Sequence, residues 1–164
     1  MPVPSLQLRD GFEPAKQAWQ TYVGETCEKL NLLFAEYMQA LGNEGQVTLR
    51  EGETFDKWGI EIKVRFRDEA PLEVLQKNVQ SGGERSVSTI MFLMALQDMV
   101  TSPFRVVDEI NQGMDERNER IVFKRIVENS VDQPGKPSRP QYFLITPKLL
   151  QVGCHACALS CDAV

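Results

Sequence analysis

Two short stretches of the sequence carry residue types that could do chemistry: a glycine-rich turn and a pair of adjacent carboxylates. The tetrapeptide Ser-Gly-Gly-Glu at residues 81–84 stands just ahead of a helical pattern. Glycines at such a position let backbone N–H groups face a phosphate without interfering side chains. Asp108 and Glu109 follow a short apolar stretch, and two adjacent carboxylates after a strand can serve a ligand. Together these residue types indicate a site that handles a nucleotide.

Each stretch on its own has a simpler structural explanation. A Gly-Gly pair ahead of a helix is usually only a turn, and two acids after a strand are often a helix cap or a solvated loop. The conjunction favours the nucleotide site, because turn chemistry alone does not place a glycine-rich helix start, an apolar helix and a strand ending in two acids in succession.

The residues around these stretches predict the elements that would position them. A helix is expected after the glycines, because apolar residues recur at threes and fours along one face: Val87, Ile90, Met91, Met94 and Ala95. Residues 104–107 read as a short strand. The acid pair then lies at the carboxyl end of that strand, which is where open α/β sheets bind ligands.

A second helix and a second strand are expected further along. Residues 116–129 have helical periodicity, and Asp115 is placed to cap that helix. Residues 132–140 are rich in proline and read as a surface loop, followed by a buried strand at 141–145. The alternation of helix and strand predicts an α/β fold with parallel pairing, which keeps the acid pair and Thr146 at one edge of the sheet.

The first part of the chain is expected to form structural elements that carry none of the candidate chemistry. Residues 1–12 have no sustained period and suggest a loose leader, whereas residues 13–41 predict one helix, roughly 40 Å long at ~1.5 Å per residue. Residues 46–50 and 58–66 alternate in polarity and are expected to form an antiparallel pair of strands. Lys63, Arg65 and Arg67 could meet a nucleic-acid backbone, but a solvated strand face is the favoured interpretation.

Composition limits the classes of protein. At 164 residues with 42% hydrophobic residues, the chain can bury one core. Its net charge of −5 argues against a protein whose whole surface binds nucleic acid. We expect an intracellular protein with no membrane partner, because the start lacks a signal-peptide pattern and the longest apolar run, residues 87–96, is too short to span a bilayer.

The C-terminal tail, residues 152–164, is rich in cysteine. Four potential metal ligands lie close together there: Cys154, His155, Cys157 and Cys161. We do not expect a metal site, because a compact four-ligand site usually draws on two separated segments.

The motifs also carry a family resemblance. Residues 81–85 resemble the signature motif of the ABC-type ATPases, residues 104–109 resemble their Walker B strand, and residues 111–115 fall where they keep the D-loop. The wider text of residues 80–89, 103–115 and 142–150 is similar to the structural maintenance of chromosomes family. The resemblance runs from residue 13 to residue 151; the tail departs from it, which suggests an altered or truncated terminus.

This resemblance implies a fold and roles for individual residues. The fold would be the C-terminal lobe of an ABC-type P-loop ATPase head, entered by a coiled-coil-proximal helix at residues 13–41. Glu109 would be the catalytic base and Asp108 would hold Mg²⁺, mostly through water. The residues expected to contact ATP, bound by a second head, are Ser81, Gly82, Gly83 and Glu84, with Asp115 helping to set that interface.

The resemblance also implies partners. The sequence Gly-x-x-x-x-Gly-Lys-Ser/Thr occurs nowhere in the 164 residues. The phosphate-binding loop would therefore come from an N-terminal half of the same head, and the isolated chain is expected to be inactive. The second head would form a hetero-dimer, with protein 6 of the family as the expected partner. DNA would be contacted through the complex, in repair and recombination, in the nucleus on chromosomes.

Two other classes stay open at this stage. The chain could be a non-catalytic interaction fragment that joins or competes for a head interface, which the missing phosphate loop allows. It could also be half of another ABC-type ATPase, from double-strand-break repair or a transporter. The residues at 111–115 and the long first helix favour chromosome maintenance.

Overall fold

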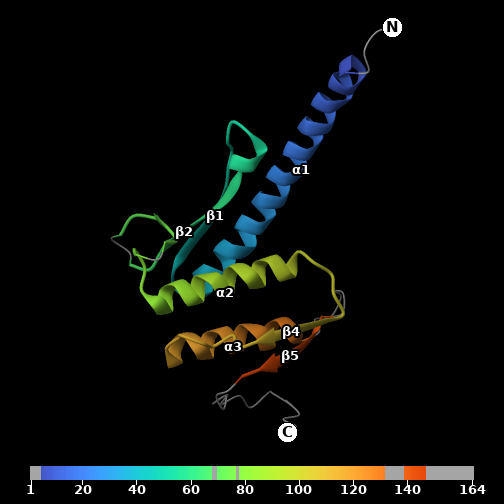
Figure 1. The fold of residues 1–164 in the computed structure, drawn as a ribbon. Helices are drawn as coiled ribbons and strands as arrows, with labels where there is room; N and C mark the ends of the chain where they lie inside the picture. Colours follow the sequence, from blue (N-terminus) through green and yellow to red (C-terminus); the bar gives the residue numbers. More distant parts are fainter. Residues whose placement is uncertain (1–4, 68–69, 77, 132–138, 147–164) are drawn as a thin grey trace. The chain divides into compact units, whose positions relative to one another are not determined.

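The computed structural model describes residues 5–67, 70–76, 78–131 and 139–146. The chain divides into two compact units, Met1–Leu75 and Gln76–Val164, and each is described by itself. Figure 1 shows the elements of both units. Helix and sheet are mixed in each, as the sequence predicts. Among the described residues, none of the helices combines the length and the apolar character needed to cross a membrane.

The first unit is one long helix and a small antiparallel sheet. Helix α1 spans Ser5–Ala40, and the strands β1 (Glu44–Arg50), β2 (Gly59–Arg65) and β3 (Glu73–Val74) lie in the order β1-β2-β3. A short 3-10 helix, η1, spans Phe55–Lys57 in the connection from β1 to β2. The expected antiparallel pair is confirmed, with Val47 opposite Ile62. The two-residue strand β3 was not predicted.

The start of α1 differs from the prediction. The helix begins at Ser5, inside the stretch expected to be a loose leader. Pro14, which a start at residue 13 would put in the first turn, lies inside the helix. A proline removes one backbone donor and crowds the preceding turn, but the residues on either side can still form a helix. The lack of apolar periodicity before residue 13 therefore did not mark the helix start.

Helix α1 packs closely against β1. Its buried side chains are Cys27, Leu30, Phe34, Tyr37 and Met38. A Cβ atom at Gly45 would lie 2.5 Å from the Met38 Cγ atom and 2.6 Å from the Phe34 Cε1 atom, so only glycine fits at this point of β1. The Val47 N–H donates to the Asn31 Oδ1 atom at 2.8 Å, which fixes the strand along the helix.

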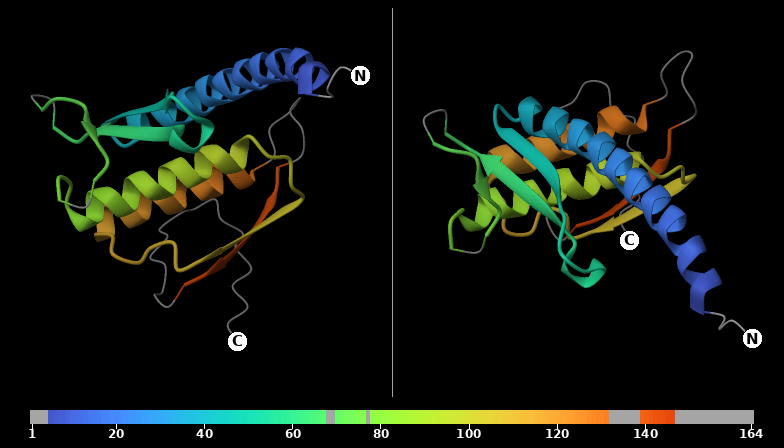
Figure 2. Two further views of the ribbon diagram at one scale, coloured as in Figure 1. Left: turned by 45° about the horizontal axis from the view of Figure 1, so that its top comes forward. Right: turned by 90° about the horizontal axis from the view of Figure 1, so that it is seen from above.

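The second unit holds both candidate stretches. It contains α2 (Gly82–Asp98), β4 (Phe104–Asp108), α3 (Glu116–Ser130) and β5 (Gln141–Ile145). Strands β4 and β5 pair in parallel, with Asp108 opposite Ile145, so the expected parallel pairing is confirmed. Helices α2 and α3 lie side by side on one face of the pair (Figure 2). Because the strands are parallel, both of their carboxyl ends lie at the same edge.

The two faces of the β4–β5 pair differ in their surroundings. Arg105 is buried on the side of the helices. The opposite face carries four apolar side chains that are 48–58% exposed, Phe104, Val106, Phe143 and Ile145. The rings of Phe104 and Phe143 meet edge to face with 6.2 Å between their centroids. Among the described residues, this apolar face has no helix over it.

Candidate nucleotide site

The Ser81 turn begins α2 with a reciprocal pair of hydrogen bonds. The Ser81 Oγ atom accepts from the Glu84 N–H at 3.2 Å, and the Glu84 carboxylate accepts from the Ser81 N–H at 2.7 Å. This is a capping box, which satisfies two backbone donors that a helix start leaves free. The Ser-x-x-Glu spacing is the sequence signature of a capping box. The prediction for these side chains, however, was only that they contact ATP.

The two glycines between them have no such structural role. Neither Gly82 nor Gly83 has a positive φ. A Cβ atom at Gly82 would meet nothing within 4 Å, and one at Gly83 would come no closer than 3.9 Å, to the Gly113 carbonyl oxygen. Glycine is less favourable than alanine inside a helix by about 1 kcal/mol. The described part of the chain therefore gives no packing reason for glycine at either position.

The acid pair ends β4 in a strained conformation. Asp108 is the last residue of the strand, and Glu109 follows with a φ of 51°, in the left-handed region that residues with a Cβ atom rarely adopt. Its N–H donates to the Ile145 carbonyl at 2.9 Å, and its own carbonyl accepts from the Gln112 N–H at 3.1 Å. Both carboxylates are exposed. Such strain persists only where neighbouring contacts fix it, and it often marks a functional site.

The loop after the acid pair returns to the start of α2. Gly113 has a φ of 78°, and a Cβ atom there would lie 3.4 Å from the Ser86 Oγ atom. The loop ends at Asp115, whose carboxylate accepts from the Asn118 N–H at 2.7 Å and so caps α3 as predicted. The structure thus brings residues of the Ser81 turn, the acid pair and the 111–115 loop to one edge of the second unit.

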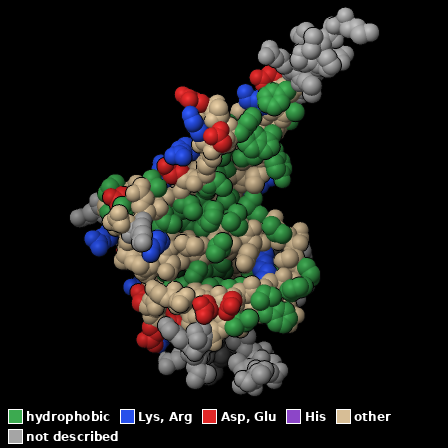
Figure 3. Space-filling model, viewed as in Figure 1, with side chains coloured by type: hydrophobic (Ala, Val, Ile, Leu, Met, Phe, Trp, Pro, Cys, Tyr) green, Lys and Arg blue, Asp and Glu red, His purple; other side chains and the backbone are tan. Residues whose placement is uncertain are grey.

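A cavity of about 330 Å³ opens between α2 and β4 at this edge. Figure 3 shows the hollow below α2. Arg85 and Thr89 line it from the helix, and Asp108 and Glu109 line it from the end of the strand. Residues of the α2 start and of the acid pair therefore border the same space.

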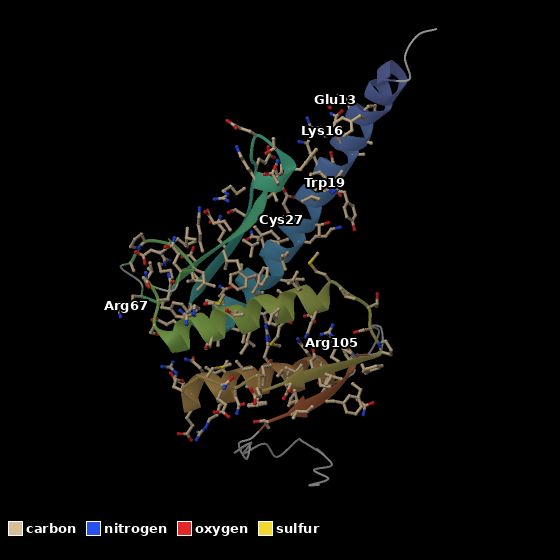
Figure 4. All side chains as sticks on the ribbon, viewed as in Figure 1. Glu13, Lys16, Trp19, Cys27, Arg67 and Arg105 are labelled. Atoms are coloured by element: carbon tan, nitrogen blue, oxygen red, sulfur yellow. The ribbon has the colours of Figure 1, made fainter. Side chains whose placement is uncertain are left out.

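The opposite, amino end of the sheet holds a buried polar cluster that the sequence analysis missed. Arg105 lies at the start of β4, near the C-terminal end of α2 (Figure 4). Its guanidinium donates to Asp98 at 3.0 Å, to the Tyr142 hydroxyl at 2.5 Å and to the Gln97 carbonyl at 2.5 Å. We call Arg105, Asp98 and Tyr142 the Arg105 cluster. An arginine inside an apolar strand was its one signal in the sequence.

Burial and hydrogen bonding shift the pKa values in this cluster. Burial raises the pKa of the Tyr142 hydroxyl above its ordinary value, although the hydrogen bond from Arg105 opposes the shift. Burial lowers the pKa of Arg105, but the hydrogen bonds to Asp98 and Tyr142 outweigh it and the net shift is upward. Both groups are therefore held in their protonated forms.

The remaining predicted groups lie outside the site. On β2, Lys63 pairs with Glu61 at 3.2 Å and Arg65 pairs with Glu44, so these two cations have acidic partners within their own sheet. Across the described part of the chain, no three His, Cys, Asp or Glu side chains gather in a way that could hold a metal ion. The cysteine-rich tail, with Cys154, His155, Cys157 and Cys161, lies outside the described residues.

Comparison with known proteins connects this geometry to a family. No protein-family model matches the chain. Structural maintenance of chromosomes protein 5 of Schizosaccharomyces pombe is 46% identical over 144 residues, which is 88% of this chain and 13% of that protein. The protein of the same name from Arabidopsis thaliana is 48% identical over 140 residues, or 85% of this chain and 13% of the relative. The chain thus spans about an eighth of the length of these curated relatives.

A solved structure shares the fold. It comes from work on ATP-driven dimerization and DNA-stimulated activation of SMC ATPases, and it superimposes with a TM-score of 0.63 at 23% identity, covering 78% of this chain and 73% of the other. At that identity the likeness establishes the fold alone: the second unit has the α/β architecture of the C-terminal lobe of such a head.

Proposed function

The chain belongs to the structural maintenance of chromosomes family, and we propose that it supplies the C-terminal half of an ATPase head that engages a second head through ATP and releases it by hydrolysis. We further propose that the second head is that of protein 6. In this proposal the assembled complex contacts DNA in repair and recombination, in the nucleus and on chromosomes.

The observation that carries the proposal is the pair of glycines at the start of α2. Gly82 and Gly83 need no left-handed backbone and leave space where a side chain would stand. Their absence of side chains leaves the first N–H groups of the helix open to an anion approaching from outside the chain. This supports ATP, held by the partner head, as the group that meets the turn.

The acid pair would perform the chemistry at the chain's own half of the site. In this proposal Asp108 would hold Mg²⁺, and its exposed carboxylate at a strand end is an oxygen ligand of the kind this ion takes. The Glu109 carboxylate would accept the proton of the attacking water. Bound MgATP supplies the phosphoryl group that is transferred to that water.

The exposed apolar face of β4 and β5 supports the requirement for an N-terminal half. Parallel sheets are nearly always covered on both faces, and here helices lie on one face alone among the described residues. We propose that the half that contributes the phosphate loop covers Phe104, Val106, Phe143 and Ile145. The isolated chain is accordingly expected neither to bind ATP tightly nor to hydrolyse it.

The decisive experiment replaces the glycines by alanine in heads reconstituted from this chain, the phosphate-loop half and the partner head. Gly82→Ala and Gly83→Ala should each stabilise the chain by about 0.5–1 kcal/mol, because alanine favours helix and meets no close atom. Light scattering with and without ATP should nevertheless show weaker head engagement. Gly24→Ala, in α1 and equally open, is the matched control and should leave engagement unchanged.

If the Gly82→Ala and Gly83→Ala heads engage like the parent, the turn is only a helix start and the proposal is wrong. A second measurement tests the base: Glu109→Gln should keep ATP-dependent engagement while turnover falls by roughly 10²–10⁴. Normal hydrolysis by this variant would place the base elsewhere.

A further inference from the structure

Asn111 is a polar side chain buried in the loop after the acid pair. It is 1% exposed. Its amide Nδ2 donates to the Glu119 carboxylate of α3 at 2.5 Å, and its Oδ1 atom accepts from the Thr146 hydroxyl at 3.1 Å. Both ends of the amide are therefore bonded, each to a different segment of the second unit. A buried amide with two specific partners fixes the relative position of those segments more strictly than apolar packing would.

The partners of Asn111 lie next to the contacts of Glu109. The Glu109 N–H donates to the carbonyl of Ile145, and the hydroxyl of the adjacent residue, Thr146, donates to Asn111. Two neighbouring residues at the end of β5 thus hold two positions, 109 and 111, of the loop that follows β4. We call these paired contacts the 109–111 clamp.

The clamp accounts for the conformation of Glu109. A glutamate with a φ of 51° is intrinsically unfavourable and relaxes unless the backbone is held on both sides. The Ile145 carbonyl holds it from one side. Asn111 holds the other side by tying the loop to Thr146 and to the first turns of α3.

We propose that Asn111 is a positioning residue for hydrolysis, which holds the Glu109 carboxylate in its reactive place through the 109–111 clamp. The inference rests on the proposed function of Glu109 as the base. It assigns to Asn111 no contact with the nucleotide. The alternative is that Asn111 only satisfies a polar position in the core, in which case its loss would change stability and not the rate of turnover.

The direction of each hydrogen bond provides a specific test, made in reconstituted heads. Asn111→Asp keeps the shape and the acceptor for Thr146 but replaces the donor toward Glu119 by a second carboxylate. Turnover should fall by about 10²-fold, the effect of a small misplacement of a reacting group, while the KM for ATP stays near the parent value. Glu119→Gln alone keeps an acceptor for the Asn111 amide, so its turnover should fall far less than that of Asn111→Asp.

The pH dependence of Asn111→Asp separates positioning from structure. Two carboxylates at this separation share one proton below the raised pKa of the pair, and that proton restores a donor. The ratio of variant to parent turnover should therefore rise as pH falls. The charged groups next to this loop include Asp108, Glu109, Asp115 and, across the cavity, Arg85; they are present in both proteins, so they contribute to both terms of the ratio.

A swapped pair completes the experiment. Asn111→Asp combined with Glu119→Gln reverses the donor and acceptor and rebuilds the bond, so turnover should recover most of the loss. Thr146→Val, which removes only the hydroxyl, should lower turnover without raising the KM for ATP, and it keeps the test usable if Asn111→Asp does not fold.

The outcomes distinguish this inference from the function on which it rests. Normal turnover by Glu109→Gln would overturn the function. If Glu109→Gln is slow but Asn111→Asp folds and turns over normally, or if neither lower pH nor the swapped pair restores its loss, Asn111 is only a core residue and the inference is wrong. For Thr146→Val, normal turnover would overturn it in the same way.

Discussion

The two ends of the β4–β5 pair differ in burial and in backbone strain, although they belong to the same two short strands. At the amino end, the Arg105 side chain is 8% exposed. Its guanidinium donates hydrogen bonds to Asp98, to Tyr142 and to a carbonyl of α2. At the carboxyl end, Asp108 and Glu109 are exposed and Glu109 has a left-handed backbone. The two terminal nitrogens of the Arg105 guanidinium are bonded within the fold at one end, and the two carboxylates are exposed at the other.

The contrast separates residues that hold the sheet from residues available to react. A buried ion pair gives little net stability, but removing one partner leaves an uncompensated charge. An exposed, strained carboxylate contributes no stability and can still serve a ligand. Substitutions at the amino end should therefore change unfolding, and substitutions at the carboxyl end should change engagement and turnover.

The largest expected effect is at the start of α2. Ser81→Arg places a long side chain where backbone N–H groups should meet an anion, so ATP-dependent engagement of reconstituted heads should be lost. Light scattering with and without ATP measures it. Ser81→Ala, which removes the hydroxyl and adds no bulk, should cost about 1 kcal/mol of stability and weaken engagement far less than Ser81→Arg. Engagement by the Ser81→Arg head would mean that the turn is purely structural.

Arg105→Met should have the next largest effect, on stability. It leaves the Asp98 carboxylate, which is 18% exposed, without its cation, so the free energy of unfolding should fall by up to about 3–5 kcal/mol in a urea titration. Lys63→Met removes a partly exposed cation that pairs with Glu61. It should change the free energy of unfolding by no more than about 1 kcal/mol. Equal effects of the two variants would remove the distinction between the buried cluster and the surface pairs.

Tyr142 adds a pH dependence to the amino end. The pKa of its hydroxyl is raised by burial, so folding favours the protonated form. Its contribution is fully present below about pH 10 and is lost as pH rises through the folded pKa. Tyr142→Phe should be less stable at neutral pH by roughly 0.5–1.5 kcal/mol, and this difference should shrink above pH 10. A difference that grows with pH would contradict the assignment.

Glu109→Gly gives the smallest expected effect on stability, with the opposite sign. Glycine adopts a φ of 51° without steric strain, so the chain should gain up to about 1 kcal/mol of stability while reconstituted heads lose turnover. Thermal unfolding measures the gain. Asp108→Gly, at a strand position with ordinary backbone, should destabilise, and a loss of stability in both variants would argue against strain at Glu109.

The sequence predicted the elements of the second unit well, because each had its own local signal. Periodicity located α2, Asp115 announced the start of α3, and the succession of helix and strand implied parallel pairing. Before residue 13 the first unit lacks apolar periodicity, so the predicted start of α1 fell later in the sequence than the observed one. The contacts inside the candidate site were not predictable, because Asn111 and Thr146 are brought together only by the pairing of β4 with β5.

The roles of single residues in the turn show the same limit. The sequence could have revealed the capping box, since Ser81 and Glu84 have its spacing. It could not show that Gly82 and Gly83 are free of internal constraint, because that depends on which atoms surround them. Nor could it show the left-handed backbone of Glu109, which depends on a carbonyl of β5.

The exposed apolar face of β4 and β5 means that the amount of this chain should match the amount of the half that covers it. The face consists of Phe104, Val106, Phe143 and Ile145. A contiguous apolar surface of this kind favours self-association whenever its covering half is scarce. Synthesis in excess of that half should then produce a species that binds hydrophobic dyes, precipitates and becomes a substrate for chaperones. Solubility on co-expression would thus report assembly of the head before any assay of ATP turnover.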